Sequence, residues 1–153
     1  MTRRLAALAL VAAWPAQAQT SPPRFEAGLQ ALGVLAEPDY GGAGPWLAWR
    51  PAPSLRLGLL ATAGASAGST AGRVEGTGHL LLEPGRMTGA GVYFLAGVAW
   101  RITHEDRAFL LAGIGVESAP GRRSGWVVEL GVGGGWRATA GYRWRWGGRP
   151  PSR

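Results

Sequence analysis

The chain has 153 residues, of which 26 are glycine and none is cysteine, and its formal net charge is +7. Without cysteine it can form neither disulfide bonds nor thiolate metal centres, and glycines without a strict three-residue period exclude a collagen-like fold. All 16 basic residues are arginine, so we attribute the charge to coding bias and expect no nucleic-acid partner. The length corresponds to one domain.

The first 18 residues have the pattern of a secretory signal peptide. A basic start at residues 1–4 precedes an apolar run at 5–14, and Ala16-Gln17-Ala18 supplies the small residues of a cleavage site. The run is too short for a membrane-spanning helix, and no run of about 18 apolar residues follows. We therefore expect an exported protein with a signal peptide at 1–18, a short leader at 19–23, a β-barrel at 24–146 and a C-terminal tail at 147–153.

Segments of alternating polarity, separated by Gly, Pro and Ser, follow the leader. Alternation with a period of two residues predicts strands with one apolar and one polar face. The eight predicted strands are 24–35, 44–50, 54–65, 72–83, 89–102, 107–117, 125–133 and 135–146. Most are longer than the five or six residues typical of soluble sheets, and a tilted membrane-spanning strand needs roughly 9–11.

The second predicted strand has no clear phase, because Trp46 and Trp49 fall on opposite faces. Residues 36–42 before it are expected to form a loop. Pro51-Ala52-Pro53 after it is expected to form a tight connection outside any hydrogen-bond ladder, since proline has no amide donor. The short connections throughout predict an antiparallel up-and-down meander that closes on itself into an eight-stranded barrel, with the last strand beside the first.

The two faces of the strands differ in a way that predicts which one lies inside. The apolar face is aliphatic at mid-strand, and aromatic residues lie toward the strand ends, as in the interfacial girdle of a membrane barrel. The other face carries arginine and glutamate among small residues, which suits a narrow, filled interior of Arg–carboxylate pairs. The predicted girdle is Phe25, Trp100, Trp126, Trp136, Trp144 and Trp146. The predicted interior charge network is Glu26, Arg50, Arg56, Arg73, Glu75, His79, Glu83, Arg101, Arg107, Glu117, Glu129, Arg137, Arg143 and Arg145.

The end of the last strand resembles the C-terminal assembly signal of bacterial outer-membrane barrels. The octet at 139–146, Thr-Ala-Gly-Tyr-Arg-Trp-Arg-Trp, has the order polar, any, Gly, any, any, hydrophobic, any, aromatic. With the signal peptide and eight strands, the chain is similar to the small eight-stranded outer-membrane barrel families. That resemblance implies location in the outer membrane, with its lipid and the barrel assembly machinery as partners. The family usually ends on the aromatic residue, whereas seven further residues follow here.

Some small barrels are lipid-modifying enzymes, so the histidines need an interpretation. His79 lies on the polar face with Glu75 and Glu83, which makes a His–Glu contact possible. Neither His79 nor His104 has a serine two residues away, so the His-x-Ser pattern of the lipid A deacylase barrels is absent. We interpret His79 as a structural member of the interior network and His104 as part of a polar turn.

Three functions remain open from the sequence. The favoured one is a structural or surface-contact barrel of the outer membrane, monomeric and without enzymatic activity, catalytic residues, cofactor or metal. The second is an exported soluble barrel in the periplasm that binds a lipid or small hydrophobic ligand. The third, and least favoured, is an envelope lipid-modifying enzyme built around His79.

Overall fold

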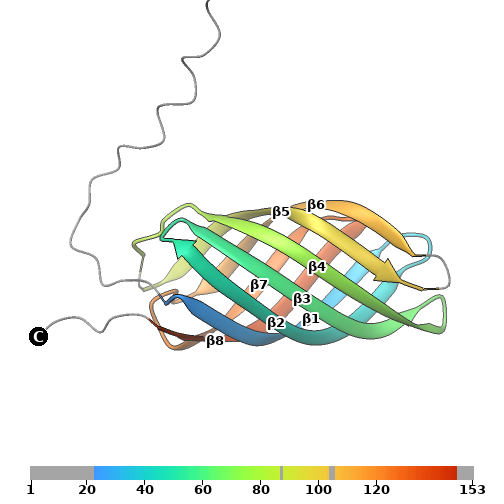
Figure 1. The fold of residues 1–153 in the computed structure, drawn as a ribbon, viewed down its shortest axis with the longest axis horizontal. Helices are drawn as coiled ribbons and strands as arrows, with labels where there is room; N and C mark the ends of the chain where they lie inside the picture. The colour runs from blue at the N-terminus through green and yellow to red at the C-terminus, as the bar shows by residue number, and fades with distance from the viewer. Residues whose placement is uncertain (1–22, 87, 104–105, 148–153) are drawn as a thin grey trace, which may run out of the picture.

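The computed structural model describes residues 23–86, 88–103 and 106–147, all of which belong to one β-barrel or its connections (Figure 1). The predicted signal peptide, nearly all of the leader, the tail beyond Gly147 and His104 lie outside the described residues. The strands are β1 (Phe25–Leu35), β2 (Tyr40–Ala52), β3 (Leu55–Ser66), β4 (Ser69–Leu81), β5 (Ala90–Ile102), β6 (Arg107–Ser118), β7 (Ser124–Val132) and β8 (Trp136–Trp146).

Each strand pairs antiparallel with the next, and β8 pairs with β1, so the sheet closes in the order β1 to β8. The closing seam runs the full length of β1, from Phe25 opposite Trp146 to Leu35 opposite Trp136. Figure 1 shows the strands tilted with respect to the long axis of the barrel, with β1 and β8 side by side. The predicted eight-stranded meander barrel is confirmed.

The barrel has two ends that differ in their connections. We call the end where β1 begins and β8 finishes the terminal end; it also carries the β2–β3, β4–β5 and β6–β7 connections. The other end, which we call the hairpin end, carries the other four. The β3–β4 hairpin turns through Ala67 and Gly68, whose φ angles are 49° and 76°. Two residues with positive φ match the right-handed twist of the flanking strands.

The second strand departs from its predicted bounds. β2 begins at Tyr40 inside the predicted loop and continues through Pro51 to Ala52, although its register with β3 shifts between Trp49 and Ala52. The strand thus extends into the predicted connection, but Pro51 itself has no partner in either ladder, because the register shift passes over it and accommodates its missing donor. The open phase is also settled, because Trp46 is 2% exposed and points inward while Trp49 is 48% exposed and points outward.

The outer face of the barrel is apolar and the inner face is polar. Large hydrophobic side chains such as Leu59, Val98 and Leu130 stay at least half exposed, whereas arginines and glutamates from the alternate positions are buried. This is the inverse of a water-soluble barrel, whose apolar face would line the interior. Among the described residues, no helix has the length and hydrophobicity to cross a membrane.

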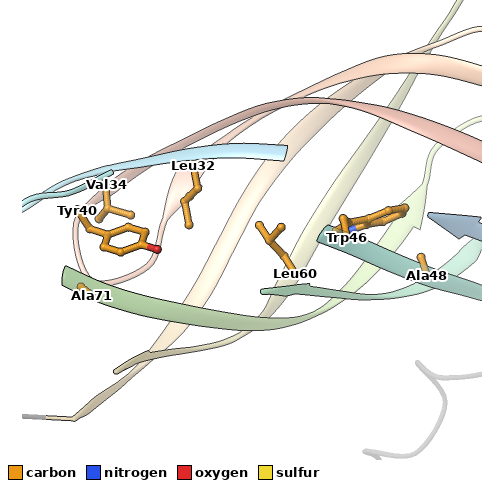
Figure 2. Close-up of a cluster of buried hydrophobic side chains, with 7 residues drawn as sticks. All are labelled: Leu32, Val34, Tyr40, Trp46, Ala48, Leu60 and Ala71. Carbon is orange, nitrogen blue, oxygen red and sulfur yellow. The ribbon is translucent and has the colours of Figure 1, made fainter. Parts of the chain in front are cut away.

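The interior also contains two small apolar clusters. Figure 2 shows one of them, with its side chains pointing into the space enclosed by the strands. Tyr40 belongs to this cluster and donates or accepts a hydrogen bond of 2.8 Å with Thr62, so its hydroxyl is satisfied. The second cluster gathers around Tyr93 and Leu111. These clusters fill space that the charged residues leave, so the inner face is packed rather than open.

Candidate functional site

Four buried glutamates organise the inside of the barrel. Alternation along the strands turns Glu26 of β1, Glu75 of β4, Glu117 of β6 and Glu129 of β7 inward, and each is at most 2% exposed. A buried carboxylate costs several kcal/mol unless it is paired and hydrogen-bonded. The arrangement of arginines around these four groups therefore decides whether the interior is stable.

A first group of charges, the terminal cluster, lies toward the terminal end. Arg50 binds Glu26 through its Nε at 2.9 Å. Arg56 donates to Glu117 at 2.8 Å and to Glu26 at 3.3 Å, so that it links the two carboxylates. Arg145 binds Glu117 at 2.9 Å. The cluster connects β1, β2, β3, β6 and β8, and the Arg56–Glu117 pair joins strands that are not neighbours in the sheet.

The second group, the central cluster, forms around the other two glutamates. Arg137 donates to Glu75 at 2.7 Å and to Glu129 at 3.0 Å. Arg73 binds Glu75 at 2.7 Å and also donates to the Gly133 carbonyl. Arg143 binds Glu129 at 2.8 Å. Because β4 and β8 are separated by three strands on either side, the Arg137–Glu75 pair spans the barrel.

Uncharged side chains complete the central cluster. Tyr93 donates to Glu129 at 2.7 Å, and Thr139 donates to the same carboxylate at 3.1 Å. The guanidinium of Arg143 lies 3.6 Å from the centre of the Trp46 ring, a cation–π contact. With its amide oxygen turned toward Arg143, Gln30 accepts two further bonds from it. None of these partners is charged, so the numbers of acidic and basic residues in the sequence do not point to them.

Arginine donors outnumber carboxylate acceptors inside the barrel. Among the described residues, seven arginines are buried against the four glutamates, and six of their guanidinium nitrogens have no hydrogen-bond partner there. Each guanidinium carries five donors and no acceptor. The result is an interior held together by cross-strand ties and bearing a net positive charge.

His79 is embedded in this network and both of its ring nitrogens are engaged. Its Nδ1 lies 3.0 Å from Arg56, and its Nε2 lies 2.7 Å from Thr77. The ring stacks on Tyr93 with 5.0 Å between centroids. The structure thus places His79 beside Arg56 and Thr77 and not against Glu75 or Glu83, the contacts that the sequence left possible. A buried imidazole with both nitrogens occupied is poorly suited to general base catalysis.

Three predicted members of the interior network lie elsewhere. Glu83 was wrongly placed inside: β4 ends at Leu81, so Glu83 is exposed in the β4–β5 connection and pairs with Arg86. Arg107 was also wrongly placed inside, because it begins β6 at the rim, where its side chain is exposed. Arg101 is buried but lies near the hairpin-end rim and donates to the Pro38 carbonyl at 2.9 Å.

The six predicted girdle residues all point outward and are between 47% and 72% exposed. Four lie at the terminal end: Phe25, Trp126, Trp144 and Trp146. Trp100 and Trp136 lie at the hairpin end. The sequence interpretation left out Trp49, which pairs directly with Phe25. The phase of its strand was open, so its face could not be assigned from alternation alone.

The described residues contain no group of three or more potential metal ligands from His, Asp and Glu. The hydrogen bonds of the inner glutamates all go to arginine, tyrosine or threonine. Each inner glutamate is thus held by arginines, and the arginines in excess leave the interior positively charged.

Comparison with solved structures supports the same architecture. The chain is similar to the N-terminal β-barrel domain of Pseudomonas aeruginosa OprF, with a TM-score of 0.62 and 15% identity over 84% of this chain and 98% of that one. It is also similar to the de novo designed TMB2.3, with a TM-score of 0.54 and 21% identity over 83% of this chain and 97% of that one. No protein-family model matches the chain, and no curated protein matches it in sequence. The likeness concerns the fold: a closed eight-stranded barrel like that of the OprF domain.

Proposed function

We propose that this chain is a structural β-barrel of the bacterial outer membrane that acts through its surface and has no enzymatic activity. The observation that carries the proposal is the inversion of the two faces. Buried arginines and glutamates fill the inside, and the outside is an apolar surface. In water such a surface would be a large aggregation liability, since soluble monomers rarely expose contiguous apolar patches above a few hundred Å².

Strand length and side-chain distribution support a membrane as the surrounding medium. The strands have 9 to 13 residues, which covers the roughly 9–11 residues that a tilted membrane-spanning strand requires. Tryptophans near both ends are suited to the two interfaces, because indole is apolar and has one polar N–H group. The closed sheet satisfies the backbone hydrogen bonds that lipid could not.

The other two functions find less support in the geometry. A soluble carrier of hydrophobic ligands would need its apolar face inside, whereas the inner face here holds two charged clusters. A lipid-modifying enzyme would need reactive groups on the face that meets lipid. His79 is instead 1% exposed and lies inside the barrel.

The proposed partners are the lipid that surrounds the barrel and the machinery that assembles it. The octet at 139–146, which resembles the assembly signal of outer-membrane barrels, forms most of β8, and its last residue, Trp146, ends the strand. Because β8 closes against β1, this sheet has no unpaired edge strand that would favour edge-to-edge association. We accordingly propose a monomer.

Fractionation and gel mobility test this proposal. We expect the mature protein to sediment with membranes, to require detergent for extraction and to run on a detergent gel at a different position before and after boiling. Boiling unfolds the barrel and changes its mobility. Recovery of the unheated protein in the soluble periplasmic fraction without detergent would refute the membrane function.

A further inference from the structure

We propose that the terminal end of the barrel binds one anionic glycerophospholipid, with an acyl chain in a groove over β1–β3 and the phosphate at Arg24. This inference rests on the proposed function, because it requires that the outer wall faces lipid. It goes further in naming one place on the wall and one class of lipid.

An apolar groove of about 430 Å³ runs along the outer wall at the terminal end. Its sides are formed by Phe25, Leu47, Trp49, Leu57, Leu59 and Trp146. Glu26, Ala48 and Gly58 also line it, but the side chains of Glu26 and Ala48 are buried inside the barrel, so the floor there is the sheet itself. The volume is within the roughly 300–1,000 Å³ of small-molecule sites. Leucines along the strands and aromatic rings near the strand ends are suited to an acyl chain.

Three aromatic residues stand in one row across the end of this groove. Phe25 is opposite Trp49 on β2 and opposite Trp146 on β8. Such a row fixes the level of the interface, because tryptophan prefers the depth of the lipid headgroups. A lipid in the groove would therefore place its headgroup just beyond this row.

Arg24 is the next residue of the chain beyond that row, where the backbone bends before β1 begins. Its backbone NH donates to the Trp146 carbonyl at 3.0 Å, and its carbonyl accepts from Arg50 at 2.8 Å, so its position is fixed between β8 and β2. Its side chain is exposed. It has no ion pair among the described residues, and Glu26, the nearest acid in sequence, is bound by Arg50 and Arg56 instead. A phosphate is the anion that would complement this guanidinium.

Charge is also distributed unequally between the two ends of the barrel. In the described connections at the terminal end, the exposed charges are Arg24, Arg86, Arg122 and Arg123 against Glu83. The hairpin end has Glu37, Asp39 and Asp106, with Arg107 at its rim. Basic residues at the membrane surface attract anionic lipids. The terminal end is thus the one suited to an anionic headgroup.

Native mass spectrometry of the folded barrel tests the proposal directly. The protein is released from micelles that contain equal amounts of phosphatidylglycerol and phosphatidylcholine, and the retained lipids are counted. We expect one retained lipid with a preference for phosphatidylglycerol. Arg24→Gln should reduce that preference about fivefold, the effect of one surface arginine, and Arg24→Lys should keep most of it. Arg86→Gln removes the same charge at the same end but over β4–β5, and should leave the preference unchanged.

A second pair of variants tests the groove separately from the charge. Leu59→Trp fills the groove, whereas Leu110→Trp adds the same side chain on β6, where Leu110 is 84% exposed. We expect only Leu59→Trp to reduce lipid retention. If Arg24→Gln failed to fold, this pair would still decide the question.

Several results would overturn the inference while leaving the membrane function intact. Equal losses for Arg24→Gln and Arg86→Gln would mean a diffuse electrostatic effect without a site. Equal losses for the two tryptophan variants would mean that the groove holds no particular lipid. Displacement of the lipid by millimolar inorganic phosphate would mean that the site recognises phosphate itself and not a lipid. Failure of the barrel to enter micelles or vesicles at all would instead refute the proposed function.

Discussion

Glu129 binds four side chains, more than a single ion pair would involve. Its carboxylate accepts hydrogen bonds from Tyr93, Arg137, Thr139 and Arg143, all in the interior. Glu129→Gln would remove the negative charge and leave two buried arginines poorly neutralised, so we expect unfolding to become easier by about 3–5 kcal/mol. Urea unfolding of the barrel in micelles, followed by tryptophan fluorescence, measures this change.

The control for Glu129→Gln is the same substitution at Glu83, whose ion pair with Arg86 is on the surface. Exposed pairs contribute about 0–1 kcal/mol. The pairing account fails if the two variants unfold at the same urea concentration.

Tyr93→Phe separates hydrogen bonding from packing at the same cluster. The phenyl ring keeps the stacking on His79 and the cation–π contact with Arg56, which lies 4.5 Å from the ring centre. Only the bond to Glu129 is lost. Hydrogen bonds to charged groups contribute about 1.5–3 kcal/mol, so the loss on urea unfolding should be smaller than for Glu129→Gln. A larger loss would show that packing of the hydroxyl, and not its bond to the carboxylate, dominates.

Alternation predicts the face on which a charged residue lies but not the partner that it finds. The sequence predicted Arg–carboxylate pairs in the interior, and the structure brings Arg137 and Arg143 to Glu129 and Arg145 to Glu117. The ion pairs between Arg137 and Glu75 and between Arg56 and Glu117 cross the barrel. Such pairs depend on strand tilt and stagger, which a single strand does not reveal. Glu83 was wrongly predicted inside because its strand ends two residues earlier than the pattern suggested.

Glycine allows close contact at the seam between β8 and β1. A Cβ added at Gly141 would fall 2.6 Å from Gln30 Cγ and closer still to the Leu29 carbonyl oxygen, whereas one added at Gly33 would meet nothing within 4 Å. We expect Gly141→Ala to destabilise the barrel by about 1–3 kcal/mol. Gly33→Ala should be neutral or slightly stabilising, because alanine restricts the unfolded chain.

The stability of the two glycine variants is compared by heating each protein and finding the temperature at which the band of the folded barrel disappears from the detergent gel. Both sites lie in the strands of the same seam and receive the same methyl group, so propensity alone cannot separate them. A midpoint that falls equally in both variants would contradict the close-contact account.

At the scale of the strand, β2 is the element whose inward and outward faces the sequence did not predict. Seven strands had a clear phase, but β2 carries Pro45 and Pro51 and has tryptophans on both faces. Its pairing with β3 passes from Ala43 opposite Ala63 to Trp46 opposite Leu60. The neighbouring strands fix its register, so the barrel as a whole determines what its local pattern leaves open.

At the scale of the whole molecule, the filled interior predicts poor conduction. Charged clusters and the apolar clusters around Leu32 and Leu95 occupy the space that the strands enclose, and eight strands leave an interior that side chains can fill. We expect the purified barrel to produce no steady conductance in a planar bilayer. Regular current steps that grow linearly with voltage would show a continuous water path and contradict this packing.

The orientation of the two faces is the central claim, and the absence of cysteine from the chain makes it directly measurable. Single cysteines replace Leu59, Val98 or Leu130 on the outer wall, or Asp39 in a connection. Each carries a nitroxide spin label in a reconstituted bilayer. We predict that labels on the wall collide with oxygen dissolved in lipid and not with a water-soluble nickel complex, while the label at 39 shows the reverse. Wall labels that collide with the nickel complex as often as the label at 39 would contradict a membrane-facing exterior.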